Sequence, residues 1–331
     1  MVSKKRNFVQ FCTIALFTAL FALTLPQNAS ALKFLSFGTG SPAGTYYFIG
    51  AGFASMINNS VEGVRVTAES TAASTENARL LIRGEMDMGL ACMGTLTDLK
   101  KQGLDVDQIR IIAVGHTSDT HWIVRKDSGI KSIYDFEGKT IGVGPAGSAT
   151  LNIWAKNHPE TGWDMPFSKF NPKYISFTEV TRGLRDKTID AGIIAAGSPL
   201  SSVMELARDI PIDLLDMEPD CLKKVRAKYS NVIPKTIPAG TYNGIDRDVH
   251  TYCLPQVWFC RKDLPDLLVY QMIKTIYDNH EDRNAIHPMA TMYTIHNAFR
   301  GSNTVPVGFH PGAILYYQEM GIWDQREQYY E

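Results

Sequence analysis

Apolar and polar positions along the chain alternate between a strand-like period of two and a helix-like period near 3.6. Strands are expected at 33–37, 64–68, 86–92, 110–115, 121–125 and 140–143, with a further extended segment at 252–261. Helices are expected at 45–57, from Ser74 to Ile82, at 149–157 and over most of the chain beyond Leu264. This alternation favours an α/β fold in which helices cover parallel sheets.

The order of strand, small-residue loop and helix begins at Lys33 and is repeated from Thr140. We therefore expect two α/β lobes, one from residues 32–118 plus 260–331 and the other from residues 119–259. Two extended hinge crossings, at about 119–126 and 251–260, would join them. A cleft between two such lobes is a common place for a small ligand to bind.

The first 31 residues have the pattern of a Sec signal peptide. Three basic residues precede an apolar run over 8–25, and Ala29, Ser30 and Ala31 follow it. We expect export to the periplasm with cleavage after Ala31. A transmembrane anchor is the alternative, but threonines interrupt the apolar run and Pro26 ends it.

Composition and charge narrow the class of protein. Without the first 31 residues the chain keeps 30 Lys plus Arg against 34 Asp plus Glu, a net charge of −4. A nucleic-acid binder is not expected from this balance. The remaining stretch, about 300 residues, is long enough for two lobes with separate cores. We expect a monomer.

Four cysteines remain beyond the predicted cleavage site: Cys92, Cys221, Cys253 and Cys260. An oxidising compartment permits disulfides. On one straight strand Cys253 and Cys260 would lie about 23 Å apart, against a limit near 7 Å for bridged Cα atoms. A bridge between Cys221 and Cys253 is therefore preferred, and Cys92 is expected to be a packed core residue.

Three loops place small or hydroxyl residues where a strand ends and a helix begins. The first amides of a helix have no internal partner and carry partial positive charge, so they bind anions. A further loop of small residues, 195–199, adds another hydroxyl. The predicted ligand-binding residues are Gly40, Gly44, Thr45, Tyr46, Ser74, Asn77, Gly147, Ser148, Ala149 and Ser198.

These residues also permit other interpretations. Ordinary strand-to-helix turns also contain glycine and serine. The segment beginning Gly38-Thr-Gly40 has Ala43 where a dinucleotide fingerprint needs its third glycine, so no cofactor is expected. His116 and His121 lack a third ligand at a useful spacing, so no metal site is expected.

An enzyme is not expected either. A hydrolase using Ser148 or Ser198 as nucleophile would need a base that the sequence does not identify. The chain also lacks the Gly-x-Ser-x-Gly elbow of α/β-hydrolases.

Seven pieces of the chain, in order, resemble the TAXI family of TRAP-transporter solute receptors. They are GTGSPAGTYY at 38–47, STENARLL at 74–81, GEMDMGL at 84–90, GPAGSAT at 144–150, IDAG at 189–192, IPAGTY at 237–242 and HPGAILYY at 310–317. The resemblance implies a type II periplasmic-binding-protein fold and TRAP-type membrane subunits driven by an ion gradient. It also implies a ligand similar to glutamate, glutamine or 2-oxoglutarate.

Two departures from the family pattern lie at predicted helix starts. Ala149 stands where the family usually has glycine, and Ala72-Ala73 replaces the glycine before Ser74. The extra methyl groups would narrow the pocket. The sequence thus predicts a solute-binding protein that captures a small carboxylate or amino acid between its lobes and delivers it to a TRAP transporter. A periplasmic sensory protein and a partner of an ATP-driven importer are the alternatives.

Overall fold

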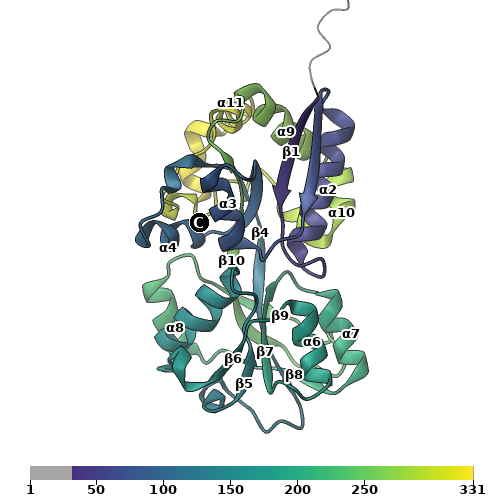
Figure 1. The fold of residues 1–331 in the computed structure, drawn as a ribbon, viewed down its shortest axis with the longest axis vertical. Helices are drawn as coiled ribbons and strands as arrows, with labels where there is room; N and C mark the ends of the chain where they lie inside the picture. The colour runs from purple at the N-terminus through teal and green to yellow at the C-terminus, as the bar shows by residue number, and fades with distance from the viewer. Residues whose placement is uncertain (1–31, 331) are drawn as a thin grey trace, which may run out of the picture. The chain divides into compact units, whose positions relative to one another are not determined.

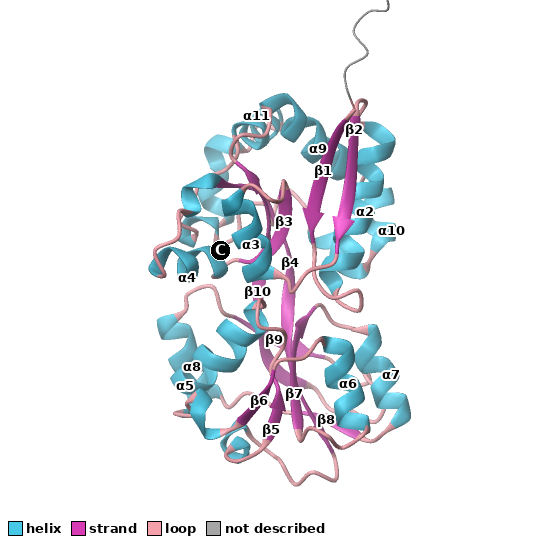
Figure 2. Ribbon diagram, viewed as in Figure 1, coloured by secondary structure: helices cyan, strands magenta, loops and turns pink. Residues whose placement is uncertain are grey.

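A computed structural model describes residues 32–330, so the predicted signal peptide lies outside the described residues. Within this range ten strands form one sheet in the order β2-β1-β3-β10-β4-β7-β5-β6, with β8 paired to β4 and β9 paired to β10 (Figure 2). The strands are β1 Lys33–Gly38, β2 Val64–Glu69, β3 Met88–Cys92, β4 Ile109–Arg125, β5 Thr140–Gly142, β6 Asn171–Lys173, β7 Ala191–Ala196, β8 Ile212–Leu214, β9 Ile233–Ile237 and β10 Val249–Arg261.

Helices flank the sheet along its length (Figure 2). They are α2 Thr45–Ser60, α3 Ser74–Arg83, α4 Thr95–Lys101, α5 His158–Trp163, α6 Phe177–Arg185, α7 Ser201–Asp209, α8 Pro219–Lys228, α9 Asp266–Asp278, α10 His280–Ile286 and α11 Pro311–Glu319. A π-helical segment, η3 Thr150–Asn157, leads into α5, and shorter turns lie at Val106–Gln108, Ile133–Phe136, Phe167–Lys169, Pro288–Met292, Ser302–Thr304 and Trp323–Tyr329. None of the helices in residues 32–330 combines the length and apolar composition that a bilayer crossing requires.

Two long strands, β4 and β10, run through the whole sheet (Figure 1). At one end β10 pairs with β3, and at the other it pairs with β9. Strand β4 pairs with β10 and then with β7 and β8. We call the elements β1–β3, α2–α4 and α9–α11 the upper half and the elements β5–β9 and α5–α8 the lower half, following Figure 1.

Each half has its own apolar core. In the upper half, Phe53 and Trp258 lie in a core between the sheet and helices α2 and α9. In the lower half, Trp122 and Trp154 lie in one core and Leu206 in another. Because the cores are separate, β4 and β10 are the principal elements that belong to both halves.

The middle of β4 differs from the prediction. Residues 110–115 and 121–125 were expected to be separate strands, but β4 is one strand of 17 residues. In the sequence, the polar run His116–His121 has the composition of a loop between two strands. In the structure its residues are buried. Backbone pairing to β10 and β7 continues across it, so buried hydrogen bonds replace water for these residues.

The other predicted elements agree with the structure to within a few residues. Helix α2 was expected at 45–57 and ends at Ser60. Helix α3 was expected at 74–82 and ends where Gly84 adopts φ 72°, a left-handed conformation that suits glycine. Helices α6, α7 and α8 were not predicted, although Ser176 and Glu179 form a capping box at the start of α6.

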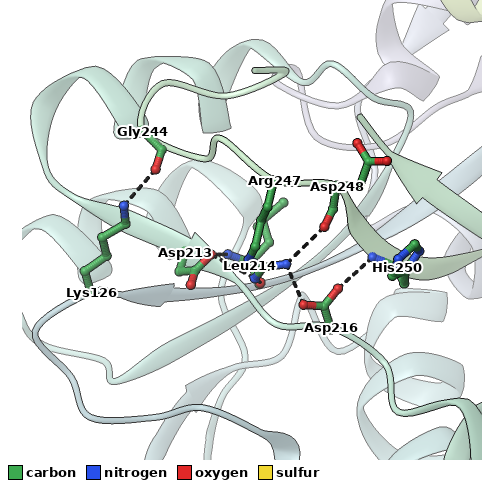
Figure 3. Close-up of polar contacts among 8 residues, drawn as sticks. All are labelled: Lys126, Asp213, Leu214, Asp216, Gly244, Arg247, Asp248 and His250. Atoms are coloured by element: carbon green, nitrogen blue, oxygen red, sulfur yellow. Dashed lines mark hydrogen bonds and ion pairs between the residues drawn. The ribbon is translucent and has the colours of Figure 1, made fainter. Parts of the chain in front are cut away.

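Arg247 fixes the loop that precedes β10 (Figure 3). Its guanidinium pairs with Asp213 at 3.1 Å and with Asp216, and donates to the carbonyl of Leu214 at 2.7 Å. The carboxylate of Asp216 also accepts from the amide of His250 at 2.7 Å. The network joins β8, the loop and the first residues of β10, and so holds one end of a long strand in place.

The predicted disulfide between Cys221 and Cys253 is wrong. All four cysteines of the described residues are buried free thiols. Cys221 lies on α8 with its sulfur 3.4 Å from the hydroxyl of Tyr134, whereas Cys253 lies on β10 opposite Asp119. The two thiols pack in different environments. Burial raises the pKa of the Cys253 thiol to about 12, so it stays protonated.

Candidate ligand-binding cavity

A cavity lies where the upper and lower halves meet. It leaves about 50 Å³ for the centres of water-sized spheres. About 10–15 Å³ of such volume holds one water molecule, so the cavity suits a compact solute. The described lining residues are Gly40, Ser41, Gly44, Thr45, Tyr46, Thr71, Ala72, Ala73, Ser74, Ser118, Pro145, Ser148, Ala149, Thr150, Trp154, Phe177, Ala195, Ala196 and Gln256.

The N-terminal ends of α2, α3 and η3 line this one cavity. Among the described residues, the backbone amides of Thr45, Tyr46 and Ser74 in the upper half have no hydrogen-bond acceptor. The same holds for the amides of Ala149 and Thr150 in the lower half. First-turn amides point out of the helix end and carry its partial positive charge. Both halves therefore present hydrogen-bond donors to an acceptor in the cavity.

At α3, part of the predicted anion site is occupied by the protein itself. The carbonyl of Gly147, from the lower half, accepts from the amides of Thr75 at 3.1 Å and Glu76 at 3.0 Å. The first turn of α3 is therefore only partly free for a ligand, because two of its amides bind the opposite half. This contact ties the two halves together beside the cavity.

The second loop carries a strained backbone. Ala73, directly before α3, has φ 73°, a conformation that glycine adopts without a steric penalty. Alanine stands here where sequences of the TAXI pattern have glycine before the serine. A non-glycine residue in such a conformation costs on the order of 1–3 kcal/mol. Contacts with neighbouring residues must therefore stabilise this unfavourable backbone conformation of Ala73 in the cavity wall.

A chain of hydrogen bonds fixes the polar side chains of the upper wall. The amide of Cys92 donates to Oγ of Ser74 at 3.0 Å, and that hydroxyl lies 3.2 Å from the hydroxyl of Tyr46. Tyr46 donates to Oε1 of Gln256, whose Nε2 donates to the carbonyl of Leu254 at 2.6 Å. Burial raises the pKa of Tyr46 well above its usual value, so the phenol stays neutral.

Three hydroxyls remain for a ligand. Ser41, Ser118 on β4 and Thr150 at the start of η3 line the cavity, and none of their hydroxyls bonds to another described residue. The hydroxyl of Ser148 is used within the protein, since it donates to the carbonyl of Pro145 at 2.8 Å and accepts from the amide of Leu151 at 3.2 Å. The hydroxyl of Ser148 therefore stabilises the loop, and its proton is not available to a ligand.

Aromatic side chains close the cavity from the lower half. Nε1 of Trp154 donates to Oγ1 of Thr120 at 2.7 Å, which fixes the indole ring. Phe177, the first residue of α6, lies against the loop at Gly44, where an added Cβ would come within 3.7 Å of its ring. With Tyr46 opposite them, these rings give the cavity a largely apolar wall.

The structure brings seven of the ten predicted residues to the cavity: Gly40, Gly44, Thr45, Tyr46, Ser74, Ser148 and Ala149. Asn77 is not among the lining residues, because its fully buried amide donates to the carbonyls of Thr39 and Leu90, both at 2.8 Å. Gly147 contacts α3 instead of the cavity.

Ser198 lies outside the cavity and bonds to the buried histidine of β4. Its Oγ is 3.1 Å from Nε2 of His121, but the hydroxyl of Tyr242 is closer, at 2.8 Å. Nδ1 of His121 lies within 3.2 Å of the carbonyl oxygens of Asp119 and Ile194, so Nδ1 carries the ring proton. Nε2 is then an acceptor, and the closer hydroxyl, that of Tyr242, donates to it. The nitrogen that would activate Ser198 is thus already engaged. Burial also lowers the pKa of His121, opposed by the charge of Asp119.

Several residues that were not predicted from the sequence also line the cavity, among them Ser118, Gln256, Trp154 and Phe177. Gln256 is a polar residue inside an apolar strand, and that polarity was the available signal. Ser118 belongs to the polar run 116–121, which is typical of a loop, so its position gave no such signal. Trp154 and Phe177 reach the cavity only through the packing of the lower half.

The sheet order, the two halves and the cavity between them define the type II periplasmic-binding-protein fold. This confirms the predicted fold class, and two solved structures with a TM-score of 0.50 share the fold. A protein from Bordetella bronchiseptica RB50 has a TM-score of 0.50 and 16% identity over 80% of this chain and 79% of that one. A structure concerning glutathione import via GshT and the cystine ABC importer TcyBC of Streptococcus mutans has a TM-score of 0.50 and 16% identity over 79% and 96%. The alkanesulfonate-binding protein SsuA from Xanthomonas axonopodis pv. citri, bound to MOPS, has a TM-score of 0.49 and 14% identity over 91% and 85%.

The chain belongs to the NMT1-like family, which it matches over residues 37–321.

Proposed function

We propose that this protein is an extracytoplasmic solute-binding protein that captures a small carboxylate and delivers it to a membrane transporter. The observation that carries the proposal is the convergence of unpaired amides from Thr45, Tyr46, Ser74, Ala149 and Thr150 on one cavity. Such amides hold an anion without a charged side chain. The shared fold with a protein of glutathione import supports a role in capture and delivery.

We propose that the two halves act as lobes, with β4 and β10 as the hinge. The separate cores support this division, since each half retains its packing if the two strands bend. In this proposal, the hydrogen bonds from the α3 amides to the carbonyl of Gly147 form when the two lobes are closed. A second contact of the same kind joins the amide of Gly197 to Oγ1 of Thr45 at 3.1 Å. Opening would break these bonds and expose the cavity.

The membrane partner that we propose is of the TRAP type, on the strength of the seven sequence pieces that resemble the TAXI receptors. Reconstituted TRAP membrane subunits provide the test, because they use an ion gradient where ABC importers use ATP. Solute uptake into vesicles that requires this protein and an ion gradient would support the proposal. Uptake that requires ATP instead would contradict it.

The ligand class is tested by a thermal-shift screen of small carboxylates on protein refolded from denaturant to remove bound solute. A ligand that binds only the folded state at 100 times its Kd adds about 2.7 kcal/mol to the free energy of unfolding. For a chain of this size that corresponds to a rise in Tm of several degrees. If no carboxylate raises the Tm of the ligand-free protein, the proposed ligand class is wrong.

A further inference from the structure

The cavity carries no formal charge in its wall. Among its described lining residues there is no Asp, Glu, Lys, Arg or His. Two carboxylates on segments that adjoin lining residues are hydrogen-bonded within the protein: Glu76 accepts from the amide of Ala72, and Asp119 accepts from the amide of Ser198 at 3.3 Å. Asp119 follows Ser118 on β4, so its side chain points to the opposite face of the sheet.

The polar groups around the cavity are unevenly divided between donors and acceptors. Five amides have no acceptor among the described residues. The hydroxyls of Ser41, Ser118 and Thr150, which can donate or accept, also have no partner there. The carbonyls of Gly40, Ser41, Pro145 and Gly147 already accept hydrogen bonds within the protein, whereas those of Thr71 and Ala72 accept none from the described residues. The cavity therefore offers a ligand more donors than acceptors, and none of the acceptors on its described lining residues carries a negative charge.

An ammonium group would be poorly accommodated here. Removing an unpaired ion from water costs several kcal/mol in a protein interior. A contact of the ammonium with the rings of Trp154 or Phe177 would return about 0.5–2 kcal/mol. The desolvation cost is the larger of the two, and no carboxylate lines the cavity to offset it. A ligand that presents only acceptors, by contrast, matches the wall.

We infer that the cavity selects a compact 2-oxo acid over the amino acid of the same carbon skeleton. This inference rests on the proposed function, and it adds which of two related carboxylates the cavity prefers. The carboxylate of a 2-oxo acid accepts from the helix amides, and its keto oxygen is a further acceptor for the hydroxyl of Ser118 or Thr150. The amino acid replaces that acceptor by a cationic donor, for which the described lining residues provide no carboxylate.

Isothermal titration of the refolded protein with matched pairs provides the test. The pairs are pyruvate with alanine, 2-oxoisovalerate with valine, and 2-oxoglutarate with glutamate. We expect the 2-oxo acid to bind at least tenfold tighter in the pair that binds best. An amino acid that binds as tightly as its 2-oxo acid would overturn the inference and leave the proposed function standing. If no member of any pair binds, the proposed function fails as well.

A pair of variants at Ala195, a lining residue on β7, separates charge from shape. Ala195→Asp introduces a carboxylate, and Ala195→Asn is its uncharged match. We expect the aspartate variant to lower the affinity for the 2-oxo acid at least tenfold and to shift the ratio toward the amino acid. The asparagine variant should keep the preference for the 2-oxo acid. Melting curves of both variants check that each is folded. An unchanged ratio in a folded Ala195→Asp variant would contradict the inference.

Discussion

Gly147 lies where the backbones of the two halves approach each other closely. A Cβ at this position would lie 3.0 Å from Cβ of Ala72 and 3.2 Å from Cβ of Glu76, both in the upper half. Overpacking of this kind costs about 1–3 kcal/mol. We expect Gly147→Ala to weaken ligand binding about tenfold or more, measured by titration calorimetry, because the closed form becomes strained.

Gly308→Ala is the matched control for that variant. A Cβ at Gly308 has no neighbour within 4 Å, so the same added methyl group should leave the affinity unchanged. Wild-type affinity in Gly147→Ala would show that the contact between Gly147 and α3 is not part of the ligand-bound state.

Two buried histidines make stability depend on pH. Burial lowers the pKa of His116 to about 3 and that of His158 to about 3, so both stay neutral in the folded protein. In the unfolded chain they take up protons below about pH 6.5. Because the unfolded state then binds more protons, the free energy of unfolding falls as pH falls from about 6.5 toward 3.

Each histidine contributes a loss of about 1 kcal/mol between pH 6 and pH 5, where the unfolded chain protonates. Urea unfolding at the two pH values measures this loss. His158→Gln should remove about 1 kcal/mol of it, although the loss of its bond to Tyr252 lowers stability at both pH values. A pH dependence that is the same in the variant would show that His158 is charged in the folded protein.

At the scale of single elements, the loop before β10 depends on Arg247. The guanidinium is partly exposed, so its ion pairs with Asp213 and Asp216 contribute no more than about 1 kcal/mol to global stability. We expect Arg247→Ala to speed amide hydrogen exchange across residues 238–248 and to leave ligand affinity unchanged. Lys224→Ala, which removes one isolated surface pair with Asp164, is the control and should change neither. Unchanged exchange in Arg247→Ala would show that the network does not hold the loop.

The sequence predicted those elements whose own residues carry the signal. The start of α2 after Gly44 and the end of α3 at Gly84 follow from local chemistry and were predicted to within a few residues. The continuity of β4 was not predicted, because the polar residues 116–121 are normally typical of a loop. Only the strands on either side of β4 show that these side chains are buried and hydrogen-bonded.

For the whole molecule, the repeated strand, loop and helix order was enough to predict an α/β fold with a cavity between two halves. It could not predict which helix amides remain free. The amides of Thr75 and Glu76 lie in the first turn of a helix, as do those of Thr45 and Tyr46. Only the amides of Thr75 and Glu76 are occupied, because they donate to the carbonyl of Gly147, which lies 71 or more positions away in the sequence. Side-chain roles such as the relay from Ser74 to Gln256 likewise depend on contacts between distant segments.

The proposed function requires that amides from both halves hold the carboxylate of the ligand. A crystal structure of the protein saturated with its tightest-binding carboxylate tests this most directly. We predict carboxylate oxygens within about 3 Å of amide nitrogens from both groups, Thr45 or Tyr46 above and Ala149 or Thr150 below. A carboxylate that contacts only one half, or that lies outside this cavity, would contradict the account.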